Sequence, residues 1–262
     1  MRVICSNNFE KGHTMSKTDS SLFLHFLGNG AAFNPAFGNT SAYIKDEKRL
    51  FLLDCGETVF SRLTDQHILN SSQDIYAAVS HLHCDHAGSL GSLILYCYYG
   101  LHSPMTLVIP DNCDQYVKQI MSLLRFMGVS DDKYHLLSAE QLNFFKPFTS
   151  FSYIPTRHDP SMFCFSFTFD TPAGGVFYSA DTSETDQLDS FLKAHPDPEA
   201  LYMEATDEDY PGNIHLYLDK LTGFLDPSLR TRTYLMHFNR PSCAEKGRAA
   251  GFRIAIPDLV RC

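Results

Sequence analysis

The segment SHLHCDHAGSL, residues 80–90, carries four side chains of metal-binding type and decides how the chain folds. It follows a short apolar run that predicts a buried strand. Residues two apart on an extended segment face the same way, so His81 and His83 can bind one ion together. The turn after them can direct Asp85 and His86 towards a second ion. An accidental cluster of histidines is the alternative, but the buried strand in front favours a metal site.

Single histidines and aspartates recur at the ends of other predicted strands, and two ions need more than four ligands. Asp54 ends RLFLLD, His158 ends FTSFSYIPTRH, Asp181 ends GGVFYSAD and His237 ends RTYLMHF. Each residue taken alone is more typical of a hydrogen-bonded surface or core group. Their recurrence after strands favours one shared site, because a rigid sheet can preorganise its ligands.

The pattern of apolar residues predicts strands in runs and in alternation with helices, which indicates an α/β protein. We expect one domain over residues 21–262, preceded by a flexible extension over residues 1–20. The predicted helices cover residues 57–67, 87–101, 113–128, 186–195, 214–225 and 243–251. The segment between His158 and Asp181 predicts a plain hairpin.

In this order, Asp54, the HLHCDH cluster, His158, Asp181 and His237 resemble the five signature motifs of the metallo-β-lactamase superfamily. The resemblance extends from about residue 21 across nearly the whole chain. It implies an αββα four-layer sandwich with the active site at one edge, between two sheets.

The resemblance also implies a role for each residue. The first ion is assigned to three histidines, His81, His83 and His158. The second ion is assigned to Asp85, His86 and His237. Asp181 would bridge the two ions, and Asp54 would orient a histidine from behind. The cofactors implied are two divalent metal ions, with zinc expected and manganese or iron compatible with the same ligands.

Within the superfamily, three segments resemble the ribonuclease Z branch: LGNGAAFNPAFGNTSAY, DCGETVFSRL and MEATDEDYPGNIHLY. The last contains Glu204 and His215. In the branch this histidine is closely followed by Ser or Thr, whereas here Leu216 and Tyr217 follow it. We expect His215, held by Glu204, to protonate the leaving oxygen of a phosphodiester, with Asp85 as a further catalytic residue. The alternative is that His215 only caps a helix.

The net charge of the chain indicates which class of substrate it can bind. The chain has 21 basic and 30 acidic residues and a net charge of −9. Ribonuclease Z binds precursor tRNA through a long basic arm. In many members of this branch the arm lies between the two motifs that here contain His158 and Asp181. These two residues are only 23 apart in the sequence, from 158 to 181. Because long nucleic acids are bound through many basic contacts, the composition disfavours them.

The remaining resemblance within the branch is to small phosphodiesterases of bacteria and phages, among them the anti-Pycsar proteins, which destroy cyclic pyrimidine signals. It implies hydrolysis of 3′,5′-cyclic nucleotides to nucleoside monophosphates. The aromatic residues weighed for base stacking, each also compatible with ordinary packing, are Tyr98, Tyr99, Phe126, Tyr210 and Tyr217. Three alternatives stay open: tRNA 3′ processing, hydrolysis of another ester, and an inactive metal-binding interaction domain.

The sequence also bears on location and assembly. It has no apolar signal segment near its start and no run of 18 apolar residues, and its eight cysteines form no C-x-x-C pair. We therefore expect reduced thiols, no membrane association and a cytoplasmic location, in the host cytoplasm if a phage encodes the protein. The related phosphodiesterases are homodimers, so the resemblance implies a homodimer for this chain as well. The apolar helix around residues 90–101 is equally compatible with a dimer interface and with the core.

Overall fold

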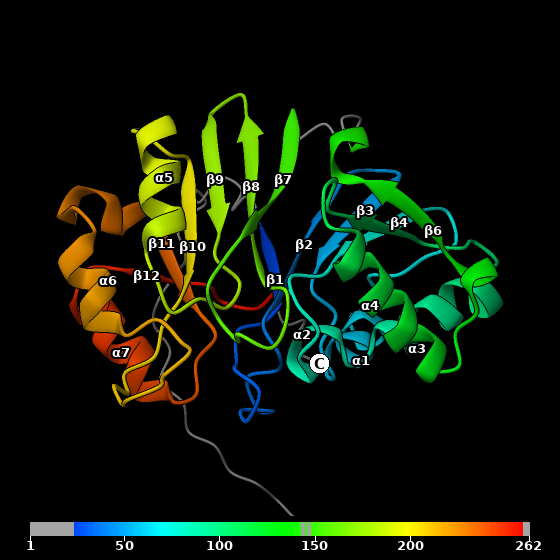
Figure 1. The fold of residues 1–262 in the computed structure, drawn as a ribbon, viewed down its shortest axis with the longest axis horizontal. Helices are drawn as coiled ribbons and strands as arrows, with labels where there is room; N and C mark the ends of the chain where they lie inside the picture. The colour runs from blue at the N-terminus through cyan, green and yellow to red at the C-terminus, as the bar shows by residue number, and fades with distance from the viewer. Residues whose placement is uncertain (1–23, 143–144, 146–147, 259–262) are drawn as a thin grey trace, which may run out of the picture.

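The computed structural model describes residues 24–142, 145 and 148–258. The extension predicted over residues 1–20 lies outside the described residues. Within them the chain forms two six-stranded sheets, with helices on the outer side of each (Figure 1). The order of the layers is therefore helix, sheet, sheet, helix, as the resemblance implied.

The strands of the first sheet are adjacent in chain order. They are β1 (His25–Gly28), β2 (Ser41–Lys45), β3 (Arg49–Leu53), β4 (Asp74–Ala78), β5 (Thr106–Ile109) and β6 (His135–Ser138). β1, β2 and β3 pair antiparallel, and β3 to β6 pair parallel. Parallel neighbours need crossover connections. These contain α1 (Val59–Asp65), α2 (Cys84–Ala87), α3 (Leu90–Leu95) and α4 (Asp114–Phe126).

The second sheet repeats this plan. Its strands are β7 (Ser150–Pro155), β8 (Phe165–Thr171), β9 (Gly174–Tyr178), β10 (Ala200–Glu204), β11 (Thr233–Met236) and β12 (Arg253–Ile254). β7, β8 and β9 are antiparallel, and β9 to β12 are parallel. The crossovers contain α5 (Asp186–Ala194), α6 (Leu218–Phe224) and α7 (Pro241–Ala249). β8 and β9 form the plain hairpin that the sequence predicts.

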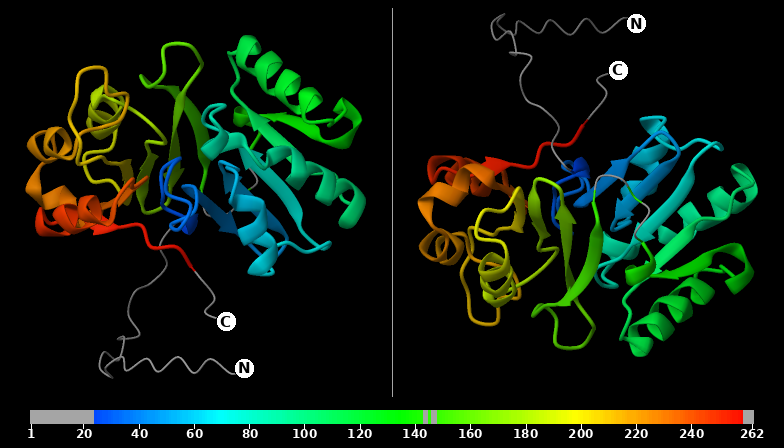
Figure 2. Two further views of the ribbon diagram at one scale, coloured as in Figure 1. Left: turned by 90° about the horizontal axis from the view of Figure 1, so that it is seen from below. Right: turned by 90° about the horizontal axis from the view of Figure 1, so that it is seen from above.

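The alternation of side chains along each strand explains the layers. In β3, Phe51 and Leu53 pack in the core between the sheets, while Leu50 and Leu52 pack on the helix side. A strand that is buried on both faces requires the continuous apolar run found there. Figure 2 shows the two halves, with the segment after β1 between them.

Two predicted helices differ from the structure. The helix predicted over residues 214–225 begins only at Leu218. Before it, the amide of Thr206 donates to the carbonyl of Leu216 at 2.9 Å, and the amide of Leu218 donates to the carbonyl of Thr206 at 2.9 Å. This sheet-like pairing holds the backbone extended, so His215 does not cap a helix.

The helix predicted over residues 87–101 is divided. After α2 and α3, the chain continues as a π-helical turn over Tyr96–Gly100. Leu93 and Cys97 are fully buried against the first sheet, so this segment belongs to the core, and its exposed large hydrophobic side chains are Tyr96 and Tyr99.

None of the helices in the described part of the chain is long and apolar enough to cross a membrane. Six cysteines within this part are free thiols: Cys55, Cys84, Cys97, Cys113, Cys164 and Cys243.

Candidate metal centre

The expected ligands meet where strands of both sheets end. Asp54 directly follows β3 and His237 directly follows β11, and both adopt a φ of 62°. Ala180, immediately before Asp181, has a φ of 47°. Residues other than glycine rarely adopt this left-handed backbone conformation, and residues held in it cluster at functional sites. The backbone is therefore strained at three points around one site.

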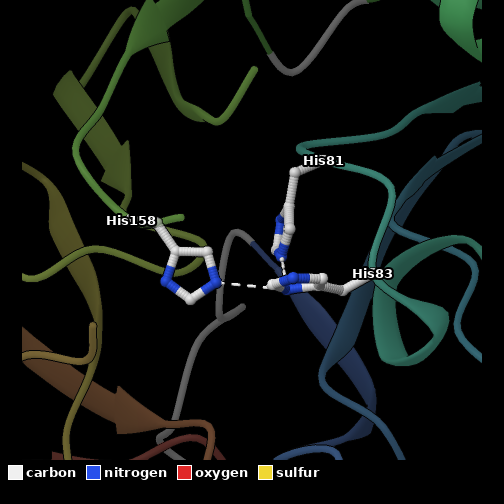
Figure 3. Close-up of side chains that lie close together, drawn as sticks. All are labelled: His81, His83 and His158. Carbon is white, nitrogen blue, oxygen red and sulfur yellow. Dashed lines mark hydrogen bonds between the residues drawn. The ribbon is translucent and has the colours of Figure 1, made fainter. Parts of the chain in front are cut away.

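Three histidines form the first group of ligands. His81 and His83 come from the segment after β4, and His158 follows β7 (Figure 3). Nδ1 of His83 lies 3.0 Å from Nε2 of His81 and 3.2 Å from Nε2 of His158. Three nitrogens that converge in this way suit one ion.

The second group combines carboxylates and imidazoles. Nε2 of His86 lies 3.2 Å from Oδ1 of Asp181 and 3.5 Å from Oδ2 of Asp85. Nε2 of His237 lies 3.2 Å from Oδ2 of Asp85 and 3.3 Å from Oδ1 of Asp181. Oδ2 of Asp181 faces the first group, 3.6 Å from Nε2 of His158. Asp181 thus lies between the two groups, where a bridging ligand would be.

Acceptor groups behind the histidines orient their rings. Nδ1 of His86 donates to Oδ2 of Asp54 at 2.9 Å, and Nδ1 of His158 donates to the carbonyl of Ile214 at 2.9 Å. Nε2 of His83 donates to Oδ2 of Asp159 at 3.3 Å. A proton on the rear nitrogen leaves the lone pair of the other nitrogen facing the site, as metal binding requires.

The electrostatics favour cations. Asp54, Asp85, Asp181 and Glu204 are all buried, and buried carboxylates need compensating charge. Burial alone would lower the pKa of His237, but Asp181, Asp85 and Glu204 raise it to about 10.

Burial likewise opposes the ionised form of Asp181, yet His237, His86 and His158 hold its pKa well below the usual range. Nε2 of His86 and Oδ1 of Asp181 are buried without a hydrogen-bond partner. Two buried atoms of this kind, 3.2 Å apart among buried carboxylates, fit a site for divalent ions.

His215 and Glu204 form a separate pair beside the metal ligands. Glu204 ends β10 and is fully buried, and its Oε2 accepts from Nδ1 of His215 at 2.8 Å. Its Oε1 accepts from the amide of Thr182. Burial lowers the pKa of His215, but the charge and hydrogen bond of Glu204 outweigh this and raise it. Asp181, Glu204, His215 and His237 also lie close enough together to form a third possible ligand group. Because each oxygen of Glu204 already accepts a hydrogen bond, we expect Glu204 to orient His215.

A cavity of about 570 Å³ opens onto the site. His83, Asp85, Asp181, His215 and His237 line it, together with residues of three loops, 31–33, 208–214 and 239–240. This volume lies within the usual range for small-molecule sites.

Of the aromatic residues weighed for stacking, Tyr210 lines this cavity. Tyr98 and Tyr99 instead lie under the ammonium group of Lys133, and Phe126 ends α4.

The structure adds residues that sequence reasoning missed. The hydroxyl of Ser80 donates to Oδ2 of Asp54 at 3.0 Å and lies 3.0 Å from Nδ1 of His81. Asp159 supports His83, and Phe33 lines the cavity. Asp159 could have been noticed as the neighbour of His158, whereas no pattern in the sequence marks Phe33.

Comparison with known proteins gives consistent matches. A family model described as "Anti-Pycsar protein Apyc1" matches residues 22–255. The Anti-Pycsar protein Apyc1 of Paenibacillus harenae is 24% identical over 247 residues, covering 90% of this chain and 98% of the relative. Ribonuclease Z 1 of Schizosaccharomyces pombe is 28% identical over 233 residues, covering 76% of this chain but 28% of that protein.

Among solved structures, the metallo-beta-lactamase fold protein YhfI from Bacillus subtilis superposes with a TM-score of 0.66. It is 17% identical, and the match covers 88% of this chain and 94% of that chain. The likeness confirms the predicted α/β fold class, an αββα sandwich of the metallo-β-lactamase type.

Proposed function

We propose that this chain, which belongs to the Anti-Pycsar protein Apyc1 family, is a phosphodiesterase with two metal ions that hydrolyses 3′,5′-cyclic nucleotides to nucleoside monophosphates. The observation that carries the proposal is the pair of ligand groups joined at Asp181, on the wall of a cavity of small-molecule size. Family membership supports a hydrolase that acts on a small cyclic nucleotide.

In this proposal His81, His83 and His158 would hold the first ion. Asp85, His86 and His237 would hold the second, and Asp181 would be shared between the two groups. When present, two divalent ions acidify a water molecule and neutralise charge on the phosphoryl oxygens. Imidazole and carboxylate ligands suit zinc, manganese or iron, and zinc is the expected occupant.

The other residues hold these ligands and move a proton. Asp54 fixes the ring of His86 through a 2.9 Å hydrogen bond. Glu204 stabilises the protonated form of His215, whose side chain lines the cavity. His215 would then protonate the leaving ribose oxygen, a step that typically contributes about 10²–10⁴-fold.

Precursor tRNA is the second candidate substrate, because the yeast ribonuclease Z shares 28% identity with this chain. Two observations support the small substrate instead. The hairpin of β8 and β9 occupies the place of the basic arm, and the chain carries a net charge of −9. A homodimeric assembly and a cytoplasmic location stay predictions.

A substrate panel tests the proposal. The purified protein is incubated with cyclic mononucleotides, cyclic dinucleotides, precursor tRNA, and lactone, thioester and sulfate esters at matched metal concentrations. We expect 3′,5′-cyclic mononucleotides to be hydrolysed with the highest kcat/KM, and Asp181→Ala to abolish this hydrolysis. Faster turnover of tRNA or of a non-phosphate ester would replace the proposal with that alternative. A fully metal-loaded protein without any turnover would instead be a binding domain.

A further inference from the structure

Two exposed aromatic side chains line the cavity beside the candidate metal centre. The side chain of Phe33 is 94% exposed and that of Tyr210 is 53% exposed, and both belong to loops that line the cavity. Leaving a phenyl ring in water forgoes the stabilisation that burial would bring. A ring held exposed next to a binding site is therefore available to a ligand.

The loop that carries Phe33 is attached to the metal centre. The amide of Ala31 donates to the carbonyl of Phe238 at 3.1 Å, and Nδ2 of Asn34 donates to the same carbonyl at 3.0 Å. Phe238 directly follows the candidate ligand His237. Hydrogen bonds on both sides of Phe33 thus fix its backbone relative to the candidate ligands.

The turn that carries Tyr210 is hydrogen-bonded to the segment of His215. The amide of Asn213 donates to the carbonyl of Tyr210 at 3.1 Å, closing a turn in which Gly212 has a φ of +83°. Proline in the second position and glycine with positive φ in the third are typical of a type II turn. Oδ1 of Asn213 also accepts from the amide of His215 at 3.0 Å. The position of Tyr210 is therefore coupled to that of His215.

We propose that Phe33 and Tyr210 bind the base of the nucleotide by stacking and so determine specificity for nucleotides over other small phosphodiesters. The inference rests on the proposed function and deepens it. Ions bound by the ligands named above would hold the phosphodiester, and the two residues line the same cavity, where the rest of a nucleotide must go. Stacking accepts any base, because every base has a π face. The site therefore accepts both purine and pyrimidine cyclic nucleotides.

The experiment compares matched variants. Phe33→Ala is paired with Phe126→Ala, since the Phe126 side chain is 93% exposed at the end of α4. Tyr210→Ala is paired with Tyr99→Ala, a tyrosine 60% exposed beside Lys133. The substrates are 3′,5′-cyclic AMP, 3′,5′-cyclic CMP and methyl riboside 3′,5′-cyclic phosphate, which has no base.

We expect Phe33→Ala and Tyr210→Ala each to raise KM for both cyclic nucleotides by about 5- to 100-fold, with a smaller effect on the abasic substrate. Phe126→Ala and Tyr99→Ala should match the wild type, and Tyr210→Phe should keep most of the affinity. If both cavity variants match their controls, the inference is wrong even though the proposed function stands. If Phe33→Ala changes the mass in light scattering but not KM, Phe33 is a contact between copies of the chain.

Equilibrium binding separates this inference from the proposed function. The wild type should bind a nucleoside monophosphate more tightly than ribose 5-phosphate, and both cavity variants should lose this difference. That result supports the base site even if no cyclic nucleotide is hydrolysed, in which case only the proposed function fails. Equal affinity of the wild type for the two ligands would overturn the base site.

Discussion

Each histidine of the candidate centre presents one nitrogen to the site, and the partner of its other nitrogen decides which one. His86 and His158 have their Nδ1 atoms engaged by Asp54 and by the carbonyl of Ile214, so each presents Nε2. His83 is reversed, because Asp159 engages its Nε2. His215 belongs to neither ligand group in the proposal, since Glu204 holds its Nδ1 and its ring lines the cavity.

His215 provides the prediction at the scale of the residue. If it protonates the leaving oxygen, His215→Ala should keep both metals while kcat falls by roughly two to four decades. The loss should shrink for a nitrophenyl phosphodiester, whose leaving group departs without a proton. Steady-state kinetics on both substrates, with elemental analysis, measure this.

Two comparisons control the His215 experiment. Glu204→Gln should lower kcat in the same pattern as His215→Ala but by a smaller factor, because Glu204 only orients and polarises the imidazole. Substitution of Asp85 or His86 should damage both substrates alike, because each substrate needs the ion. Equal losses on good and poor leaving groups for His215→Ala would make His215 a positioning residue.

At the scale of the element, the short helix α2 places Asp85 and His86, and close packing determines its position. A Cβ atom added to Gly56 would lie 1.9 Å from the carbonyl oxygen of Asp85, and the amide of Cys55 donates to the carbonyl of His86 at 2.7 Å. The segment after β3 and the helix after β4 therefore touch through their backbones. No side chain fits between them.

Gly56→Ala should consequently shift α2 and damage the second group of ligands. We expect kcat/KM to fall by more than tenfold and the free energy of unfolding to fall by about 1–3 kcal/mol, the usual cost of overpacking. Gly223→Ala is the control, because nothing lies within 4 Å of its added Cβ and alanine favours its helix by about 1 kcal/mol. Wild-type metal content and stability in Gly56→Ala would show that α2 can move without cost.

On the scale of the whole molecule, the candidate centre joins the two halves of the sandwich. His81, His83, Asp85 and His86 follow a strand of the first sheet, whereas His158, Asp181 and His237 follow strands of the second. An ion that binds residues from both halves would stabilise the folded state only, because the unfolded chain does not hold these residues together.

Removal of the metals should therefore lower the melting temperature. We expect two ions per chain by elemental analysis, and a decrease in Tm of about 5–10 °C after chelation, reversed by added zinc. Asp181→Ala should already melt near the chelated value, since it removes the shared ligand. Full activity with at most one tightly held ion, or a Tm that chelation leaves unchanged, would contradict the binuclear site.

The sequence alone predicted the features that depend on short patterns. The apolar runs in β3 and β4 predict buried strands, and the ligands of the HLHCDH cluster lie within six positions of one another. The carboxyl ends of strands that run in the same direction lie at one edge of a sheet. Residues that directly follow such strands therefore lie close together once the strands pair. Asp54, His158, Asp181 and His237 could be found for this reason.

Contacts between distant segments were decided only by the tertiary structure. Backbone pairing with Thr206 keeps the preceding residues out of the helix, so α6 begins only at Leu218 although the sequence pattern predicts an earlier start. The loops of Phe33 and Tyr210 line one cavity although they are far apart in the sequence. Neither outcome has a local signal, because each depends on which remote backbone supplies the hydrogen bonds. A single sequence specifies the side chains that can bind a metal, but the packing of the two sheets decides what stands beside them.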